Sequence, residues 1–243
     1  MTKLSVNLNK IALIRNSRGS DFPKLLDFAR LCIKAGAHGL TIHPRPDQRH
    51  ARYDDVYELA KLVQEHPQVE LNIEGYPADR FLEVVLEARP TQCTLVPDEP
   101  GQLTSDHGWD VIKHHQRLQE YVQQLREAGI RSSLFVDPDV EQIQAMEKTT
   151  TDRIELYTES YAKAFGTGEE DEVLQKFKLA AEAAQAIGLG VNAGHDLNQE
   201  NLGRFLSIPG ILEVSIGHAL TVESLIDGFE ATIRNYLAII ESS

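Results

Sequence analysis

The stretch Gly39-Leu-Thr-Ile-His-Pro-Arg-Pro-Asp-Gln-Arg-His50 predicts a buried β-strand that ends in basic side chains. Its first half alternates apolar and polar residues, which is the two-residue period of a strand. Pro44 and Pro46 cannot donate hydrogen bonds to an internal sheet ladder, so the strand stops after Arg45. Four potential cations crowd the strand end, namely His43, Arg45, Arg49 and His50. In an acidic chain, such a cluster suits a phosphorylated or carboxylated ligand held beside an acid/base group.

Strand-like runs of this kind alternate with amphipathic helical stretches along the whole chain. Eight strands are predicted at 4–8, 39–45, 69–74, 92–96, 131–136, 153–157, 189–193 and 212–216. Eight helices are predicted at 21–35, 54–64, 78–88, 110–128, 139–148, 172–187, 198–207 and 222–240. An alternation this regular requires right-handed crossovers and predicts a parallel sheet.

Eight strand–helix units predict one α/β domain over residues 1–243, a closed parallel (β/α)8 TIM barrel with extra helical segments. The main alternative is an open doubly wound sheet. That fold needs a glycine-rich phosphate-binding turn after its first strand, and Asn7-Leu-Asn-Lys10 is not such a turn. The barrel is therefore the preferred prediction.

Composition argues against several classes of function. The 243 residues carry a formal net charge of −13, so we expect no non-specific binding to nucleic acid or to an anionic membrane surface. Cys32 and Cys93 lie in apolar contexts, which predicts buried reduced thiols and no zinc site. The N-terminal sequence lacks the apolar run of a signal peptide, and no uncharged apolar run reaches membrane-spanning length. We therefore expect a cytoplasmic protein.

Polar residues occupy the carboxyl ends of six predicted strands, where barrels of this class carry their active sites. They are Asn7, Asn9 and Lys10, His43 and Arg45, Asn72 and Glu74, Glu155 and Tyr157, Asn192 and His195, and Gly217 and His218. A barrel packed only for stability would carry Val, Ile and Leu at inward positions, so these residues are predicted to converge on one mouth. One histidine there is usually a hydrogen-bonded core residue, but three at equivalent strand ends indicate a reactive site.

The sequence leaves two roles open for Glu74. It is either a buried salt-bridge partner of Arg45 or Lys10, or a general base whose pKa is raised by burial. The Gly-His pairs at 194–195 and 217–218 each lie between a strand and a helix start, where free N–H groups bind phosphate.

Two loops add candidates. Arg15, Asn16 and Arg18 are expected to form a basic loop after the first strand, with Arg18 available to a phosphate. The loop 98–109 is long enough to act as a lid, with Gly101 and Gly108 as hinges and Thr104 as a hydroxyl donor.

Several blocks of residues occur in order along the chain. They are Val6-Asn-x-Asn-Lys-Ile-Ala-x-x-Arg-Asn-x-Arg-Gly19, Gly39-x-Thr-x-His-x-Arg-x-Asp-x-Arg-His50, Asn72-Ile-Glu74, Leu95-Val-Pro97, Ser133-Leu-Phe-x-Asp137, Asn192-Ala-Gly-His195 and Ile216-Gly-His-Ala219. Together they resemble the pyridoxine 5′-phosphate synthase family. The resemblance implies an enzyme that joins 1-deoxy-D-xylulose 5-phosphate to 3-amino-2-oxopropyl phosphate, giving pyridoxine 5′-phosphate, phosphate and water. It also implies no metal or organic cofactor, two phosphorylated small-molecule substrates as ligands, and a symmetric homo-oligomer, often an octamer.

Carried over by motif, the resemblance assigns the chemistry to acid/base residues His43 and Glu74, to the proton donor His195, and to Glu155, which stabilises charged intermediates. It assigns the amino-ketone phosphate to Asn7, Arg18, Asp196, Gly217 and His218. It assigns the pentulose phosphate to Arg45, His50 and Thr104.

This chain departs from the family pattern at three places. Many members have Asp-His at Asn9-Lys10, Gly at Asp196 and His at Tyr157. Asn9 cannot act as a base, whereas Lys10 offers a cation to a phosphate or hydroxyl, or an amine for a Schiff base. Asp196 is expected to contact phosphate only through its backbone N–H, because its carboxylate repels the ligand.

Three other functions stay open from the sequence. The first is a Schiff-base aldolase that uses Lys10. The second is a metal-dependent barrel hydrolase that uses His43, His195, His218 and Glu74. The third is a non-catalytic binder of pyridoxine phosphate.

Overall fold

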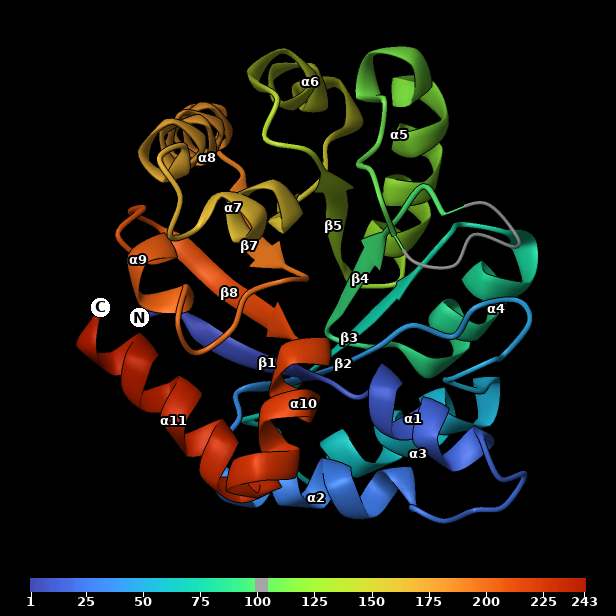
Figure 1. The fold of residues 1–243 in the computed structure, drawn as a ribbon. Helices are drawn as coiled ribbons and strands as arrows, with labels where there is room; N and C mark the ends of the chain where they lie inside the picture. The colour runs from blue at the N-terminus through green and yellow to red at the C-terminus, as the bar shows by residue number, and fades with distance from the viewer. Residues whose placement is uncertain (99–104) are drawn as a thin grey trace.

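Eight parallel strands close into one barrel in the computed structural model, which describes residues 1–98 and 105–243 (Figure 1). The strands are β1 (Lys3–Asn7), β2 (Gly39–Ile42), β3 (Glu70–Gly75), β4 (Gln92–Leu95), β5 (Arg131–Val136), β6 (Arg153–Tyr157), β7 (Gly190–Gly194) and β8 (Ile211–Ile216). They follow chain order around the barrel, and β8 pairs with β1 to close it. The predicted (β/α)8 barrel is confirmed, and the open doubly wound alternative is wrong.

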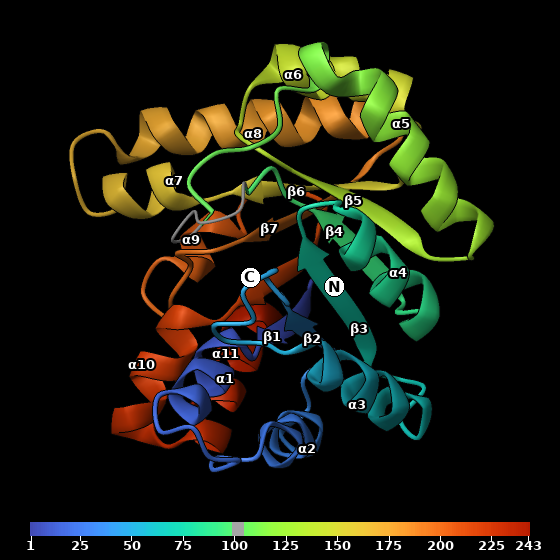
Figure 2. The same ribbon diagram turned by 90° about the vertical axis from the view of Figure 1, so that its right-hand side faces the viewer.

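Helices surround the barrel on the outside (Figures 1 and 2). They are α1 (Asn9–Asn16), α2 (Leu25–Ala35), α3 (Tyr53–Gln64), α4 (Asp79–Ala88), α5 (Val111–Glu127), α6 (Val140–Ala145) with the 3-10 turn η1 (Met146–Thr149), α7 (Glu159–Ala164), α8 (Glu170–Ala186), α9 (Leu202–Phe205), α10 (His218–Asp227) and α11 (Phe229–Ser242). No helix within the described ranges, 1–98 and 105–243, is long and apolar enough to cross a bilayer.

Strand bounds agree with the prediction to within one residue, apart from β2. That strand ends at Ile42, three residues earlier than expected. Pro44 has no N–H to offer, and the N–H of His43 bonds to the side chain of Asn9 at 2.8 Å instead of to a neighbouring strand. The strand therefore ends at the residue that directly precedes the basic cluster.

Three helical predictions were wrong. Residues 9–16 form the helix α1, although a loop was predicted there. The buried face of α1 consists of Ile11, Ala12 and Arg15, and the arginine interrupts the apolar pattern by which a helix is recognised in a sequence. The stretch 158–171, where no helix was predicted, contains α7. The single helix expected at 222–240 is two helices, α10 and α11, which break at Gly228, where φ is +83°. A left-handed residue cannot continue a right-handed helix.

The apolar strand residues face outward, towards the helices. Leu4, Val6, Leu40 and Ile42 are fully buried in one continuous core that includes the inner faces of the helices. The alternate strand residues point into the barrel and are mostly polar. Their direction is established by hydrogen bonds between strands that are not neighbours, because Gln92 Nε2 on β4 donates to Glu213 Oε1 on β8 at 3.2 Å.

Polar side chains fill the lower part of the barrel as well as its mouth. Asn192 is bonded to Arg153 and to Gln92, at 3.1 and 3.3 Å, and Asn72 accepts from Thr94 at 3.0 Å. Asn72 and Asn192 were expected at the mouth, but the structure places them in this interior network. A polar inward residue in this barrel is therefore not by itself a mark of the reactive site.

A buried ion pair ties α1 to α3. Arg15 Nη1 and Nη2 bond to the two oxygens of Asp55 at 2.5 and 2.9 Å, and both side chains are 5% exposed. Arg15 also donates to the carbonyl of His50 at 3.2 Å. Asp55 in turn accepts from the backbone N–H of Arg52 at 2.7 Å, at the start of α3. The expectation that Arg15 belongs to a basic loop after the first strand is wrong. Arg15 lies on α1 and holds the loop after β2 in place through the carbonyl of His50.

We predict that Asp55→Ala lowers the free energy of unfolding by about 3–5 kcal/mol, because it leaves the Arg15 guanidinium buried without its counter-charge. Chemical denaturation followed by circular dichroism measures this loss. Asp54→Ala, in the same first turn but exposed, is the matched control and should cost less than about 1 kcal/mol. Equal losses in the two variants would contradict the assignment.

Candidate active site

A cavity of about 520 Å³ opens at the carboxyl ends of the strands. Eleven of the predicted site residues line it: Asn7, Asn9, Lys10, His43, Arg45, His50, Glu74, His195, Asp196, Gly217 and His218. The strand ends that carry them are distant in sequence, and closure of the barrel brings them together. The remaining lining residues are Leu13, Arg49, Ser105, Tyr157, Glu159 and Ser215.

Asn7 and Asn9 form a chain of hydrogen bonds along one wall of the cavity. Asn7 Oδ1 accepts from the N–H of Asn9 at 3.0 Å, and Asn9 Oδ1 accepts from the N–H of His43 at 2.8 Å. Asn7 Nδ2 lies 3.4 Å from Glu74 Oε2 and donates to it. An amide at position 9 therefore supports the backbone of His43, a task that needs an acceptor and no proton transfer.

His43 and His50 form an edge-to-face pair, with ring centroids 6.0 Å apart. Burial lowers the pKa of His43 well below its usual value, and the charge of Arg45 adds to this. Burial and the charges of Arg45 and Arg49 lower the pKa of His50 to about 4. Both rings are therefore neutral at pH 7. The Nδ1 atom of His50 accepts from the N–H of Ala51 at 2.8 Å, which leaves the hydrogen on Nε2 as a donor.

Two buried carboxyl groups lie at the bottom of the site, Glu74 on the cavity surface and Glu155 beneath it. Glu74 is 3% exposed, and burial together with the charges of Asp98 and Glu213 raises its pKa to about 8. Glu155 is 1% exposed, and burial, with Glu74 and Glu213 nearby, raises its pKa well above the usual carboxyl range. Among the described residues, Glu74 Oε1 and both oxygens of Glu155 have no hydrogen-bond partner. Buried acids of this kind mark functional sites.

The structure describes the surroundings of Glu74, for which the sequence left two roles open. Arg45 pairs with a different carboxylate, that of Asp98, and Glu74 accepts a hydrogen bond from the neutral Asn7. Glu74 is thus surrounded by more negative charge than positive charge. This environment fits a proton carrier better than a salt-bridge partner.

His195 follows β7 and is surrounded by aromatic rings. Its ring lies 4.7 Å from that of Phe135 and 5.4 Å from that of Tyr157, measured between centroids. Burial and the charge of Arg45 lower its pKa to about 4. Its backbone φ is +83°, a left-handed value that costs a non-glycine residue about 1–3 kcal/mol and is typical of functional sites.

The two Gly-His turns have a steric basis as well as an electrostatic one. A Cβ on Gly217 would lie 2.9 Å from Cβ of Asn7, so only glycine allows β8 to approach β1 so closely at the mouth. Gly217 also immediately precedes α10, so the free N–H groups at the start of this helix follow a residue that lines the cavity. His218 and Asp196 are exposed at the rim.

Three predicted site residues are not placed on the cavity surface. Glu155 lies beneath it and Arg18 is exposed outside it. Thr104 lies outside the described residues, as does the proposed hinge Gly101.

Gly108 was expected to be a second hinge, but a Cβ there would lie 2.3 Å from the backbone N of Asp137. Close packing against β5 therefore explains that glycine.

Sequence reasoning missed four lining residues. Ser215 is two positions before Gly217, and the strand period alone would have identified it as inward-facing. Leu13 and Glu159 lie on α1 and α7, the two helices that were predicted as loops. Ser105 carried no signal, because its partner Asp98 is known only from the structure.

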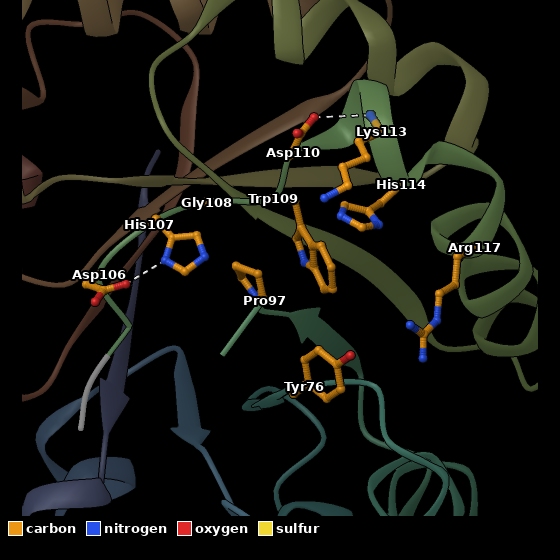
Figure 3. A pocket seen from close by; sticks show the side chains of 10 residues that line it. All are labelled: Tyr76, Pro97, Asp106, His107, Gly108, Trp109, Asp110, Lys113, His114 and Arg117. Atoms are coloured by element: carbon orange, nitrogen blue, oxygen red, sulfur yellow. Dashed lines mark hydrogen bonds and ion pairs between the residues drawn. The ribbon is translucent and has the colours of Figure 1, made fainter. Parts of the chain in front are cut away.

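A second cavity, of about 710 Å³, lies outside the mouth between α5 and the ends of β3 and β4. Figure 3 shows its wall of Tyr76 and Trp109, whose ring centroids are 6.1 Å apart, and the basic side chains of Lys113 and Arg117 beside them. It contains none of the predicted catalytic residues. The smaller cavity is therefore the candidate active site.

No cluster of three or more His, Cys, Asp or Glu side chains is placed to hold a metal ion in the described part of the chain. His43, His195, His218 and Glu74 do not form such a cluster, although they come in two pairs from neighbouring strand ends, those of β2 and β3 and those of β7 and β8.

Comparison with known proteins gives relatives over the full length. A pyridoxine 5′-phosphate synthase from Parabacteroides distasonis is 50% identical over 243 residues, which is 100% of both chains. One from Xanthomonas oryzae pv. oryzae is 52% identical over 250 residues, covering 100% of this chain and 98% of the relative.

Solved structures share the architecture at much lower identity. A mutant tryptophan synthase α-subunit from Pyrococcus furiosus has a TM-score of 0.66 at 16% identity and covers 100% of this chain and 98% of its own. Phosphoribosylanthranilate isomerase from Thermotoga maritima has a TM-score of 0.62 at 13% identity and covers 100% of both chains. These similarities show the barrel fold alone.

The family described as "Pyridoxal phosphate biosynthesis protein PdxJ" has a sequence model that matches residues 4–242. This match and the two relatives cover essentially the whole chain at an identity at which fold and family are shared. The chain therefore belongs to the PdxJ family of pyridoxal phosphate biosynthesis proteins.

Proposed function

We propose that this protein acts as a pyridoxine 5′-phosphate synthase, joining 1-deoxy-D-xylulose 5-phosphate to 3-amino-2-oxopropyl phosphate with release of phosphate and water. The observation that carries the proposal is the meeting of His43, Glu74 and His195, from three different strands, on one cavity. Ring formation by condensation, dehydration and enolisation moves several protons, so it needs several proton carriers in one place.

The three residues divide the proton transfers by their surroundings. His43 is neutral at pH 7 and can accept a proton. Glu74, with a pKa of about 8, is present in both forms near neutral pH and can donate as well as accept. His195 donates after the substrates bind, because two phosphates bring negative charge that opposes Arg45 and raises the pKa of the ring. Glu155 stabilises positive charge that develops on intermediates.

Two anion sites at opposite sides of the cavity would hold the substrates. Arg45 and His50 bind the pentulose phosphate, His50 through its Nε2–H. The start of α10, with Gly217, His218 and the side chain of Asn7, binds the amino-ketone phosphate. Lys10 supplies a cation between them, with Asn9 beside it. Arg18 and Thr104 complete these sites in the family pattern, and Asp196 contributes its N–H.

We also propose a homo-oligomer of single-domain subunits, an octamer by resemblance. Apolar side chains exposed on the adjacent helices α1 and α10 support an interface (Figure 2). Ile14 on α1 is 46% exposed, and Leu225 and Ile226 on α10 are 80% and 84% exposed. Exposed apolar groups gathered on neighbouring helices mark association surfaces.

Incubation of the purified protein with both phosphorylated substrates should release inorganic phosphate and produce the absorbance of pyridoxine 5′-phosphate. Borohydride added during turnover should not attach substrate to Lys10, because the proposed chemistry passes through acid/base groups. Absence of both products would refute the proposal. Covalent trapping on Lys10, with activity lost in Lys10→Ala and kept in His43→Ala, would favour the Schiff-base aldolase.

The pH dependence of kcat/KM should show an inflection near the raised pKa of Glu74, about 8, well above the ordinary carboxyl value. Glu74→Gln should remove this inflection and lower kcat by roughly 10²–10⁴-fold, since one proton carrier is lost. Glu83→Gln is the control, because that carboxylate is 64% exposed on α4. A retained inflection in Glu74→Gln would assign it to another group.

Gly194 gives a test of Glu155. A Cβ on Gly194 would lie 2.2 Å from Glu155 Oε1, so Gly194→Ala must displace that carboxyl group. We expect kcat to fall by at least about tenfold while the protein stays folded. Gly203→Ala is the matched control, because the nearest atom to its Cβ is 3.6 Å away, an ordinary contact. If Gly194→Ala keeps the wild-type kcat, catalysis does not require the Glu155 carboxyl group to stay in its present position.

A further inference from the structure

Asp98 is a buried carboxylate that neither the sequence motifs nor the proposed proton transfers use. It follows β4, and its side chain is 1% exposed. One oxygen, Oδ2, pairs with Nη2 of Arg45 and accepts from Oγ of Ser105 at 2.7 Å. The other, Oδ1, has no hydrogen-bond partner among the described residues. Arg45 and Ser105 both line the candidate active site.

We infer that Asp98 is a positioning residue of this site, which holds Arg45 in the orientation that receives the pentulose phosphate and places a negative charge beside Glu74. The inference rests on the proposed function and extends it by one residue. Asp98 acts through two neighbours and not on the reacting atoms.

The first part of the inference follows from the geometry of the pair. The Arg45 side chain is 7% exposed, so its guanidinium is held largely away from water. A buried guanidinium needs a hydrogen-bonded counter-charge, and the direction of its N–H groups is set by that partner. Ser105 Oγ donates to the same oxygen of the carboxylate and so also restrains it. Asp98 therefore contributes to the orientation of Arg45 before any phosphate arrives.

The second part follows from the charges around Glu74. The groups that act on it are Asp98 after β4, Glu213 on β8, Glu155 on β6 and Arg45 after β2. After burial itself, Asp98 is the largest influence that raises the pKa of Glu74. Arg45 acts in the opposite direction. Loss of the Asp98 charge would remove the first influence while the opposing influence of Arg45 remains, so the pKa of Glu74 would fall.

A purely structural ion pair makes different predictions. Buried pairs often contribute little net stability, and a role confined to folding would change the two substrates' KM values alike and leave the pH profile in place. Asp171 provides the comparison, because it also pairs with an arginine, Arg204, at 2.7 Å, but is 87% exposed and does not line the cavity.

Asp98→Asn keeps the size and an acceptor oxygen for Arg45 but removes the charge. We expect its KM values to stay within about threefold of wild type, while the Glu74 inflection in kcat/KM moves to lower pH by at least about half a unit. The direction is the same whether the protonated or the ionised form of Glu74 is the active one. Asp171→Asn, measured in parallel, should leave the profile unchanged.

Asp98→Ala removes the acceptor as well. We expect KM for 1-deoxy-D-xylulose 5-phosphate to rise by about tenfold or more, with KM for 3-amino-2-oxopropyl phosphate nearly unchanged, because only one phosphate depends on Arg45. Circular dichroism confirms that each variant is folded, and Asp98→Asn carries the test if Asp98→Ala does not fold.

An unchanged inflection in Asp98→Asn, or an equal rise of both KM values in Asp98→Ala, overturns the inference. These outcomes are read against wild-type turnover. Wild-type protein that forms no pyridoxine 5′-phosphate contradicts the proposed function itself, whereas normal wild-type turnover with unaltered variants contradicts only the role of Asp98.

Discussion

The structure depends on one constraint, which is that a polar side chain buried inside the barrel costs free energy unless it finds a hydrogen-bond partner there. The strands direct Leu, Ile and Val to the helices and polar residues to the axis, the reverse of a barrel filled with apolar layers. Gln92, Asn192 and Glu213 answer this constraint by bonding across the interior. Such bonds hold opposite strands in register, because an unpaired buried polar group costs more than the bond returns.

The hydrogen bonds of this network are more complete in the lower barrel than near the mouth. In the lower barrel Glu70 pairs with both Lys3 and Arg131, so its pKa is lowered although burial opposes this. Near the mouth, Glu74, Glu155 and His195 carry buried polar atoms without partners among the described residues. The hydrogen-bonded lower barrel thus supports Glu74, Glu155 and His195, whose unpaired atoms are available to a ligand. The candidate active site therefore differs from the rest of the interior in its unpaired buried polar atoms, and not in polarity itself.

The surroundings of the site are supported from outside the barrel. Arg15 on α1 reaches Asp55 on α3 and the carbonyl of His50, so the loop that carries the basic cluster rests on two helices. Asn9 links β1 to the backbone of His43. An amide serves this purpose as well as a carboxylate does, which explains physically how Asn9 fits a position where many relatives of the implied family have Asp. Variation there changes the support of His43 and leaves His43, Glu74 and His195 themselves unchanged.

The sequence by itself determined the eight strands, their parallel order and the motif blocks, because the two-residue and 3.6-residue periods and the strand ends are local properties. It also identified His43, Glu74 and His195 as candidates, since each lies at a strand end. Only the tertiary structure showed that Arg45 pairs with Asp98, 53 residues away, and that Asn72 and Asn192 belong to the interior network. It also revealed α1, where a buried arginine replaces an apolar residue in the stripe. Partners across a barrel are chosen by its closure and stagger, which no local pattern records.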